Sequence, residues 1–382
     1  MKKTFFLFAL ALSGSISAQV IPFDSPAWTF KGKGVIQEYY EGKSALYLKE
    51  SGALISDAQF KNGVIEFDMY FKDLWTFSGF YFRVQDEANY EELYFRPHRR
   101  GKPDAYQYCP KINGKASWQL YHDQHKGVFT GNPEFYPAEE LQGYNGKIDL
   151  PLDRWMHVKL VVAGNQAELY LDREESPSFF INEFKGPDAK GPVGIYTGWG
   201  GVHFANFSVT SNDSQRLSSE RKIVSEPLEN RIESWEVSNT LEEAKIQHVL
   251  LSDELLGQLK WKKLASENSG ITNLSRVARV KDGKNTVITK LEIQANQDMI
   301  KAFTLGYSDR VAVFCNGQKI YAGTNGYRTR DFRFLGTIGL FDEIYLPLKK
   351  GKNVVYCAVS ESFGGWGVMG QIDREGIRIK GD

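Results

Sequence analysis

The sequence predicts an all-β protein built from two antiparallel β-sandwich (jelly-roll) domains. Nearly every readable segment alternates apolar and polar residues with the period of two that a half-buried strand requires. Turn residues, such as Gly164-Asn165, separate these short segments. The aromatic content of 14%, with 19 Tyr, 25 Phe and 8 Trp, favours strands as well. Together these observations indicate sandwiches rather than strands that alternate with helices.

The N-terminal residues 1–18 stand apart from the predicted fold. A basic start and an apolar run from Phe5 to Leu12 precede small residues that end at Ala18. This order is typical of a secretory signal peptide. Because the run is too short to cross a bilayer as a helix, we expect no transmembrane segment. The mature chain is then exported to the periplasm or the extracellular space.

Residues 19–210 are predicted to form the first sandwich domain. The alternating segments that we interpret as its strands are 64–71, 79–85, 90–98, 156–163, 167–172, 193–198 and 202–209. The first three follow one another with short connections, which predicts a meander. Ser-rich, charged residues with few large apolar side chains follow, and we predict a linker at 211–230.

Residues 231–382 are predicted to form the second sandwich domain. RVAVFCNGQKIYAG (310–323) is a hairpin signal with Asn316-Gly317 at its tip. Further strands are expected at 343–348, 353–360 and 376–380. The one helical pattern lies at 241–260. Cys315 and Cys357 lie in strand-like runs, and whether they are bonded stays open.

The charge balance argues against two classes of partner. Without Lys2 and Lys3 the chain has 45 basic residues against 47 acidic ones, a net charge of −2. Nucleic acids and anionic membranes select basic patches, so neither is expected as a partner. Aromatic rings can stack on the apolar faces of sugars, which suits an oligo- or polysaccharide as partner, although an aromatic-rich β core accounts for most of these residues.

The stretch YEELYFRPHRR, residues 90–100, carries the most chemistry. With a period of two, its polar row holds Tyr90, Glu92, Tyr94, Arg96 and His98, and its apolar row includes Leu93 and Phe95. If the three strands of the meander share a core, their polar rows share the opposite face. The residues from the neighbouring strands that we predict on this ligand-binding face are Glu66, Asp68, Tyr81, Arg83 and Gln85. Arginine forks, carboxylates and tyrosines are suited to holding a hydroxyl-rich ligand, and a merely solvated strand face is the alternative.

The next segment is predicted to supply loops beside the same face. We expect Trp118, Tyr121 and His122 to contact the ligand, because binding residues concentrate on such loops. His122 and His125 have a spacing that a metal could use, but a His-x-x-His pair without further ligands is a weak signal. The metal content therefore stays open. No cofactor is evident, and a structural Ca²⁺ is left open.

The first domain resembles a known superfamily. RWMHVKLVVAGNQAELYLD (154–172) and GPVGIYTGWGGVHFANFSV (191–209) are similar to segments of concanavalin A-like lectin/glucanase sandwiches. Within that superfamily the resemblance is to laminin-G-like domains and the 3-keto-disaccharide hydrolase group, over about residues 20–210. The resemblance implies a glycan site on the concave sheet or its rim. The paired-acid motif of laminarinase-type glucanases is absent, since EFDMYF (66–71) has only its first two acids.

The C-terminal section, from about residue 225, resembles galactose-binding-like β-sandwiches. GYSDRVAVFCNGQKIYAG, YRTRDFRFLG (327–336), LPLKKGKN (346–353) and SFGGWG (362–367) carry this resemblance. It implies an accessory sugar-binding module. Trp366, flanked by glycines, is the ligand-binding residue expected there, although a core tryptophan under a tight turn is an equal alternative.

These observations lead to three hypotheses about function. The first is a secreted protein that recognises carbohydrate on the concave face of the N-terminal sandwich. The second is an enzyme that cleaves a glycosidic bond by hydrolysis or elimination, with 3-keto-glycosides included as substrates. In that case Glu92 or His98 is the general base, Tyr94 the proton donor, and Arg83 or Arg96 the stabiliser of negative charge. The third is a structural adhesion module.

Overall fold

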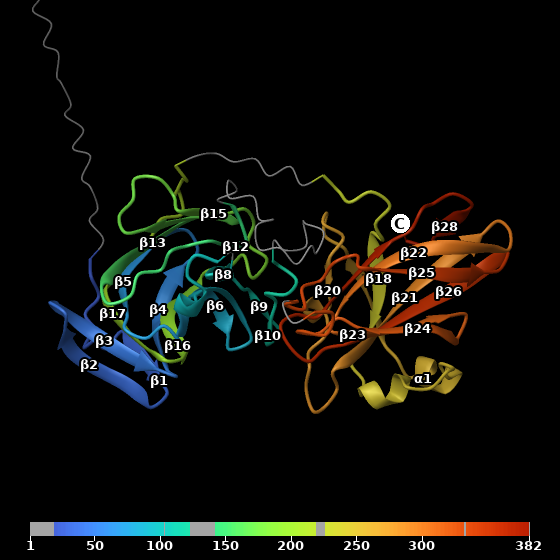
Figure 1. Ribbon diagram of the computed structural model, residues 1–382, viewed down its shortest axis with the longest axis horizontal. Coiled ribbons are helices and arrows are strands. Elements are labelled where there is room, and N and C mark those ends of the chain that lie inside the picture. Colours follow the sequence, from blue (N-terminus) through green and yellow to red (C-terminus); the bar gives the residue numbers. More distant parts are fainter. Residues whose placement is uncertain (1–18, 103, 123–141, 219–225, 332–333, 382) are drawn as a thin grey trace, which may run out of the picture.

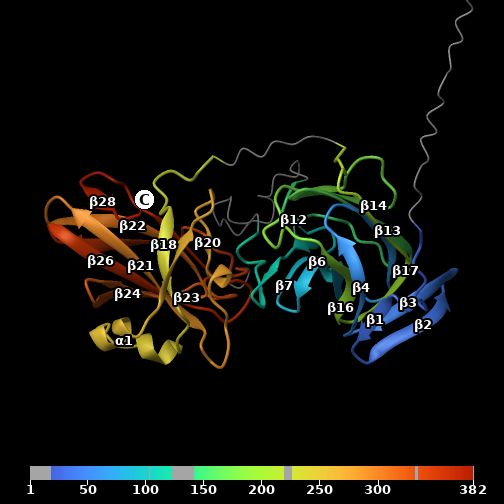
Figure 2. The same cartoon turned by 180° about the vertical axis from the view of Figure 1, so that it is seen from behind.

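A computed structural model describes residues 19–102, 104–122, 142–218, 226–331 and 334–381. The described chain forms two antiparallel β-sandwiches that lie side by side (Figure 1). The first is coloured blue to green and the second yellow to red, and the view from behind shows the same arrangement (Figure 2). The predicted all-β fold is therefore confirmed. The predicted signal peptide at 1–18 lies outside the described residues and stays a prediction.

The N-terminal sandwich packs two sheets face to face, which we call sheets A and B. Sheet A runs in the order β11 (Gln142–Gly143), β15 (Phe179–Ile181), β14 (Gln166–Leu171), β13 (Trp155–Ala163), β5 (Gly63–Phe71), β17 (Gly201–Ser211), β3 (Lys43–Lys49) and β2 (Gly34–Tyr40). Sheet B runs β1 (Trp28–Lys31), β4 (Gly52–Phe60), β16 (Gly191–Trp199), β6 (Phe77–Asp86), β7 (Asn89–Phe95), β8 (Tyr106–Tyr108) and β12 (Asn145–Gly146), with β9 (Lys111–Ile112) and β10 (Lys115–Ala116) beside β7. A single 3₁₀ turn, Pro97–Arg99, follows β7.

The core of this sandwich is aromatic. Phe67 of sheet A meets Phe80 of sheet B with ring centroids 5.2 Å apart. Leu93 and Phe95 of β7 are fully buried in the same cluster. The apolar row predicted for residues 90–98 therefore faces the core, which leaves Glu92 and Tyr94 on the outer face of sheet B.

The predicted meander is wrong in one respect. β6 and β7 pair, but β5 pairs with β13 and β17 in sheet A. The connection from Phe71 to Phe77 crosses from one sheet to the other instead of closing a hairpin. Alternation shows which row of a strand is buried, but it does not show which sheet the strand joins.

The C-terminal sandwich also packs two sheets, which we call sheets C and D. Sheet C runs β19 (Trp261–Ala265), β18 (Ser234–Ser238), β21 (Thr286–Ala295), β26 (Gly351–Ser360), β23 (Arg310–Cys315) and β24 (Gln318–Thr324), with β28 (Ile377–Ile379) beside β21. Sheet D runs β20 (Thr272–Asn273), β27 (Gly367–Gln371), β22 (Met299–Ser308) and β25 (Asp342–Leu348). The short helices are η4 (Glu243–Ile246), α1 (Asp253–Gly257) and η5 (Leu274–Arg276).

The predicted hairpin and strands of this half are confirmed, whereas most of the helical pattern is not helical. Asn316 and Gly317 have φ values of 51° and 85°, as the two-residue turn between β23 and β24 requires. Residues 241–260 form only η4 and α1, because their leucines pack on sheet C rather than along one helix face. Cys315 and Cys357 are buried free thiols.

Polar and apolar contacts join the two sandwiches. Gln119 Nε2 donates to the carbonyl of Leu335 at 2.7 Å, and Tyr121 Oη donates to Glu267 Oε1 at 2.7 Å. Leu120 lies in a buried apolar cluster with residues of the C-terminal sandwich. Residues 219–225 of the predicted linker lie outside the described residues, so the domain boundary stays a prediction.

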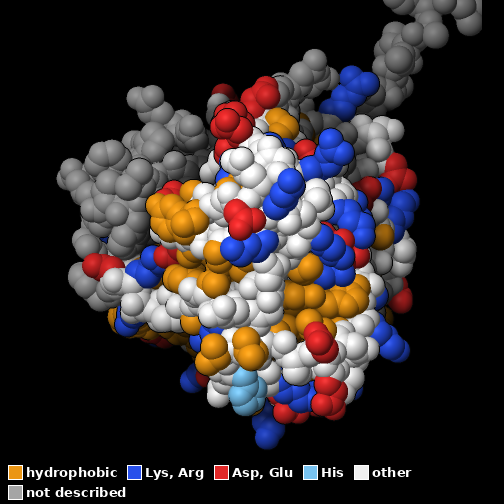
Figure 3. All heavy atoms as spheres, turned by 90° about the vertical axis from the view of Figure 1, so that its right-hand side faces the viewer, with side chains coloured by type: hydrophobic (Ala, Val, Ile, Leu, Met, Phe, Trp, Pro, Cys, Tyr) orange, Lys and Arg blue, Asp and Glu red, His pale blue; other side chains and the backbone are white. Residues whose placement is uncertain are grey.

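The end of the C-terminal sandwich that faces away from the N-terminal one has a mixed surface. Lys and Arg side chains are interspersed with Asp, Glu and hydrophobic side chains over this end (Figure 3). Tyr345 of β25 is 60% exposed.

Candidate functional site

The outer face of sheet B presents side chains of β7, β6 and β16 in cross-strand rows. Glu92, Tyr81 and Gly194 form one row, because Tyr81 pairs with both neighbours. The other rows consist of Tyr94, Gly79 and Tyr196, and of Phe77 and Trp199. Adjacent rows are about 7 Å apart, the rise of two strand residues. This face is the candidate functional site.

Glu92 lies half-buried at the centre of a group of tyrosines. Its Oε1 accepts a hydrogen bond from the hydroxyl of Tyr196 on β16. The ring of Tyr81 lies 5.8 Å from that of Tyr196 and 5.6 Å from that of Tyr90. Lys111 Nζ donates to Tyr90 Oη at 3.1 Å. These five residues are called the Glu92 cluster below.

Burial raises the pKa of Glu92 to about 7, although the hydrogen bond from Tyr196 and the charge of Lys111 oppose the shift. A carboxyl with this pKa exchanges its proton near neutral pH, which suits a general acid or base. Burial and the charge of Glu92 raise the pKa of Tyr81 to about 12. Burial also raises the pKa of Tyr196 well above its ordinary value, so its hydroxyl remains a donor.

Aromatic rings lie at the end of the same face and form what we call the aromatic shelf. The ring of Trp75 stacks on that of His98 at 5.1 Å, and His98 lies 5.2 Å from Trp199. Phe77 stacks on Trp199 at 6.3 Å with an interplanar angle of 12°. Trp75 is 67% exposed and Trp199 is 39% exposed. Burial and the nearby charge of Arg96 lower the pKa of His98, which favours the neutral imidazole.

Two glycines let the rings lie close to the sheet. A Cβ at Gly194 would lie 2.6 Å from the ring of Tyr81, and a Cβ at Gly198 would lie 2.8 Å from the ring of Phe77. Any larger residue would push these rings away from the strands. The face is therefore covered by aromatic rings at close range, a surface that suits the C–H face of a sugar ring.

Tyr94 and Arg96 lie against one another beside the Glu92 cluster. Tyr94 is buried, and the guanidinium of Arg96 lies 5.3 Å from its ring. Arg96 Nε donates to the carbonyl of Asp104 at 2.8 Å, and its Nη2 lies 3.3 Å from Asp104 Oδ2. Arg99 pairs with the same carboxylate at 2.8 Å. Arg96 is thus held by Asp104 rather than free to reach into solvent.

The predicted loop residues are placed differently from one another. Trp118 packs against Tyr94 and Tyr196, and His122 is buried with its ring 6.4 Å from that of Trp118. Tyr121 instead bonds to Glu267 across the boundary between the sandwiches. Trp118 is therefore buried beside Tyr94 and His122 beside Trp118, so neither is exposed to a ligand as predicted, whereas Tyr121 joins the two sandwiches.

Arg83 is not on the predicted face. A bulge between Phe82 and Asp86 breaks the β6–β7 register, and Arg83 has a φ of 50°. Its side chain is fully buried, and its Nε and Nη2 donate to the carbonyl of Lys61 at 3.0 and 2.8 Å. The bulge adds residues to the strand and turns Arg83 inward. Gln85 is exposed and bonds to the carbonyls of Arg83 and Lys190.

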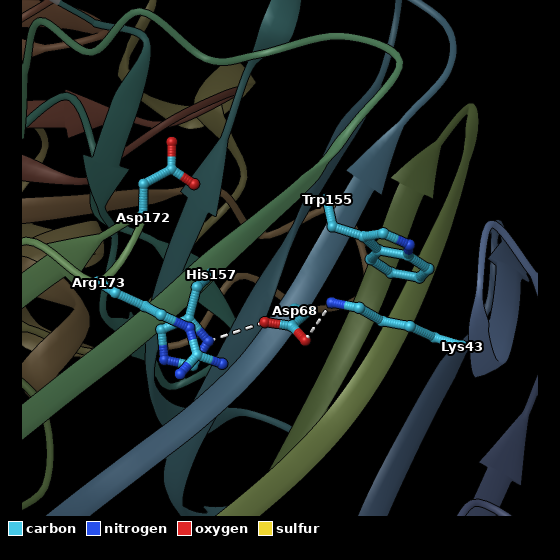
Figure 4. A pocket seen from close by; sticks show the side chains of 6 residues that line it. All are labelled: Lys43, Asp68, Trp155, His157, Asp172 and Arg173. Atoms are coloured by element: carbon cyan, nitrogen blue, oxygen red, sulfur yellow. Dashed lines mark hydrogen bonds and ion pairs between the residues drawn. The ribbon is translucent and has the colours of Figure 1, made fainter.

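Glu66 and Asp68 are also not on the predicted face, because β5 belongs to sheet A. Asp68 lines a pocket of about 150 Å³ with Lys43, Trp155, His157, Asp172 and Arg173 (Figure 4). Its carboxylate accepts hydrogen bonds from Lys43 at 2.7 Å, His157 at 2.8 Å and Asn206 at 2.6 Å. Glu66 lies 3.7 Å from the other ring nitrogen of His157.

The charged side chains in this pocket form ion pairs and hydrogen bonds with one another. Hydrogen bonds that His157 donates to the carboxylates of Asp68 and Glu66 raise the pKa of His157 to about 9. Bonds from His157 and Lys43 outweigh burial and lower the pKa of Asp68 to about 2. Because the carboxylate of Asp68 already accepts three donors, we interpret the cluster as a structural charge network on sheet A.

Trp366 is a core residue, so the predicted sugar contact is wrong. Its side chain is fully buried, and its Nε1 donates to the carbonyl of Val359 at 3.0 Å. The neighbouring aromatic residue, Phe363, is exposed instead. Of the two alternatives weighed from the sequence, the tryptophan under a tight turn is confirmed.

Metal binding stays open. Within the described ranges, no three His, Cys, Asp or Glu side chains are grouped so that they could hold a metal ion. His125 of the predicted pair lies outside those ranges. The structural Ca²⁺ that the sequence left open is not tested by this arrangement.

Sequence reasoning missed Trp75, Trp199 and Tyr196. A signal was present in YTGWGG (196–201), where aromatic residues alternate with glycines at a strand end. Glycine in a strand often marks a close approach of other groups to the sheet. Lys111 had no comparable signal, because its position beside Tyr90 depends on the pairing of β9 with β7.

Residues 24–210 match the family model described as the 3-keto-alpha-glucoside-1,2-lyase-like domain. This confirms the resemblance of the N-terminal domain to the 3-keto-disaccharide hydrolase group, which relates it to proteins that act on carbohydrate. The match ends at residue 210, and the galactose-binding-like resemblance of the C-terminal section stays a prediction. No curated protein matches the sequence.

Several solved structures are similar to the chain. The carbohydrate binding module CBM66 from Bacillus subtilis is 18% identical, with a TM-score of 0.35 over 48% of this chain and 96% of that one. A Bacillus licheniformis beta-glucanase is 12% identical, with a TM-score of 0.35 over 52% and 99%. A Caenorhabditis elegans galectin is 10% identical, with a TM-score of 0.30 over 48% and 96%. The described part of the chain contains no helix with the length and hydropathy of a membrane span.

Proposed function

We propose that the N-terminal sandwich binds a sugar on the outer face of sheet B and cleaves a 3-keto-glycoside there by elimination. The observation that carries this proposal is the half-buried carboxyl of Glu92. Glu92 is suited to taking a proton from a bound sugar, because its pKa is about 7 and a hydrogen bond from Tyr196 orients it. It also lies on the same face as the exposed rings.

The aromatic shelf supplies the binding surface in this proposal. A sugar ring stacks its C–H face on Trp75 or Trp199, and its hydroxyls remain free to bond to His98 or to water. The rings are held by one another, so little ordering is needed when the ligand binds. The reacting ring then lies toward the Glu92 cluster.

Elimination needs one base rather than two carboxylates. A ketone at C3 acidifies the proton on C2, and the Glu92 carboxylate takes that proton. The electron pair of the C–H bond first forms the enolate and then the C1–C2 double bond as the C1–O bond breaks. The leaving oxygen takes a proton from water, and Glu92 returns its proton to solvent. The ammonium of Lys111, the charge that acts on Glu92, stabilises the enolate oxygen.

Hydrolysis by a pair of carboxyl groups is less well supported. Retaining and inverting glycosidases use two carboxyl groups, separated by about 5–5.5 Å or about 6.5–9.5 Å. The carboxylate further along this face, Asp104, is occupied by Arg96 and Arg99. The family description names a 1,2-lyase, which agrees with a single base.

The test is a panel of glycans and 3-keto-glycosides incubated with the purified mature protein. We expect 3-keto-glycosides to release their aglycone, whereas the parent glycosides, which lack the acidic C2 proton, are bound but not cleaved. Retention of both classes without product would favour the second candidate function, carbohydrate recognition without turnover. The exposure of Trp75 and Trp199 supports that candidate as well. Export of the protein is proposed from the pattern of residues 1–18 alone.

A further inference from the structure

Two exposed aromatic rings of the C-terminal sandwich lie next to the N-terminal one. Phe363 is 56% exposed and Tyr327 is 45% exposed, and their ring centroids are 6.4 Å apart. Neither belongs to the buried clusters of the C-terminal sandwich. Folding of that sandwich therefore gives no reason for two large rings to face solvent at this place.

Contacts with Trp118 and Leu335 place these rings beside the candidate site. The ring of Phe363 lies 5.9 Å from that of Trp118 in an edge-to-face arrangement. Leu335, from the same loop as Tyr327, packs against the cluster of Tyr94, Cys109 and Trp118. Tyr196, which bonds to Glu92, packs against that cluster too. A buried apolar cluster thus connects Tyr196, which bonds to Glu92, with the C-terminal loops that carry Phe363 and Tyr327.

Hydrogen bonds hold both loops in position. The backbone N–H groups of Ser362 and Phe363 donate to Asp309 Oδ2 at 2.7 and 2.9 Å. Gln119 of the N-terminal sandwich donates through its backbone to Gly364 at 3.0 Å and through its side chain to Leu335 at 2.7 Å. The rings are therefore fixed relative to the N-terminal site before any ligand arrives, which lowers the entropy cost of binding.

We propose that Phe363 and Tyr327 form a second sugar-stacking subsite, so that both sandwiches contribute to one binding site for a carbohydrate of two or more rings. This inference rests on the proposed function. The reacting ring lies at the Glu92 cluster, and the next ring stacks on Phe363 and Tyr327. The C-terminal sandwich then selects oligosaccharides over monosaccharide glycosides, whereas Trp366, buried in the core of that sandwich, does not contact the sugar.

The experiment compares a one-ring and a two-ring probe. Methyl 3-keto-α-glucoside and the corresponding 3-keto-α-disaccharide are supplied to the full chain, to Phe363→Ala, to Tyr327→Ala and to Tyr345→Ala, the exposed aromatic control on β25. For the disaccharide we expect kcat/KM to fall about tenfold in each subsite variant. For the methyl glycoside we expect kcat/KM of the subsite variants to stay at the wild-type value. Tyr345→Ala should leave kcat/KM unchanged for both probes. Phe363→Leu, which keeps apolar bulk without a flat ring, serves as a second variant if Phe363→Ala unfolds.

Four outcomes contradict the subsite. Phe363 and Tyr327 variants that keep full activity on the disaccharide would show that the rings do not touch it. An equal loss on both probes would place them at the reacting ring instead. A chain that neither binds nor cleaves either probe would remove the proposed function and this inference with it. A lower kcat/KM for the disaccharide in Trp199→Ala, together with the full kcat/KM in Phe363→Ala, would overturn the subsite alone.

Discussion

The hydroxyl of Tyr196 donates a hydrogen bond to the carboxyl of Glu92 across β6, which lies between their two strands. Gly79 occupies the β6 position between Tyr196 and Tyr94 and places no side chain there. Tyr196 orients the carboxyl, whereas burial opposes its ionisation. A carboxyl that is fixed in position and close to half-ionised at neutral pH is the arrangement that general acid–base chemistry uses.

Replacing Trp199 with alanine should weaken sugar binding without changing the fold. Trp199 is partly exposed and belongs to the aromatic shelf, so its truncation removes a stacking surface and little core packing. We expect Kd or KM to rise about tenfold. Calorimetric titration measures this directly. Tyr39→Ala, an exposed aromatic on the edge strand β2 of sheet A, is the control and should leave binding unchanged. If sugar binding were weakened equally in Trp199→Ala and Tyr39→Ala, the aromatic shelf would have no specific role in binding.

Replacing Arg83 with alanine should destabilise the protein. The change deletes donors to the carbonyls of Lys61 and Gly164 and removes a positive charge that favours the ionised form of buried Glu91. We expect a loss of roughly 3 kcal/mol in the free energy of unfolding. Gln85→Ala, an exposed change on the same strand, should cost less than about 0.5 kcal/mol. Thermal melts compare the two, and a stable Arg83→Ala protein with weakened sugar binding would restore the original prediction for this residue.

The Asp68–His157 pair should stabilise the protein in a defined pH window. The pKa of Asp68 is lowered to about 2, so its contribution is present above its ordinary value of 3.8 and is lost as the pH falls toward 2. The pKa of His157 is raised to about 9, so its contribution is complete below 6.5 and is lost as the pH rises through 9. The window of full stabilisation therefore runs from about pH 4 to about pH 6.5.

Asp68→Asn should accordingly lower Tm most within that window. At pH 6 we expect the free energy of unfolding of Asp68→Asn to be about 2 kcal/mol lower than that of the wild type, and its Tm about 5 °C lower. At pH 9.5 both decreases should be smaller. Sugar binding should be unchanged, because the pair lies on sheet A. A variant that keeps its Tm at pH 6 but loses sugar binding would show that the pocket on sheet A is the functional site.

Alternation along the chain predicted the strands and the direction of their side chains. Leu93 and Phe95 face the core and Glu92 faces outward as a period of two requires. The sheet that β5 joins could not be predicted, because the same short connection allows a hairpin or a crossing between sheets. Arg83 was misplaced for a related reason, since a bulge changes the alternation locally and leaves no mark in residue type.

Non-local pairing accounts for the rest of what the sequence did not reveal. Tyr196 is 104 residues from Glu92 along the chain, and only the β16–β6–β7 order brings them together. Trp366 and Phe363 lie in one loop, yet one is buried and the other exposed. Residue type indicates an aromatic contact, but the packing of two sandwiches decides which ring makes it.

The most direct measurement of the central claim is kcat/KM for a methyl 3-keto-α-glucoside as a function of pH, with wild type, Glu92→Gln and Asp68→Asn. Methanol release, followed by NMR, reports the reaction. Because the base form of Glu92 is lost as the pH falls through its pKa of about 7, we predict a tenfold decrease per pH unit below that value in the wild type and in Asp68→Asn. Glu92→Gln should lose at least about a hundredfold at pH 8 and show no such decrease. Glu92→Gln with the wild-type rate and pH profile would contradict the account.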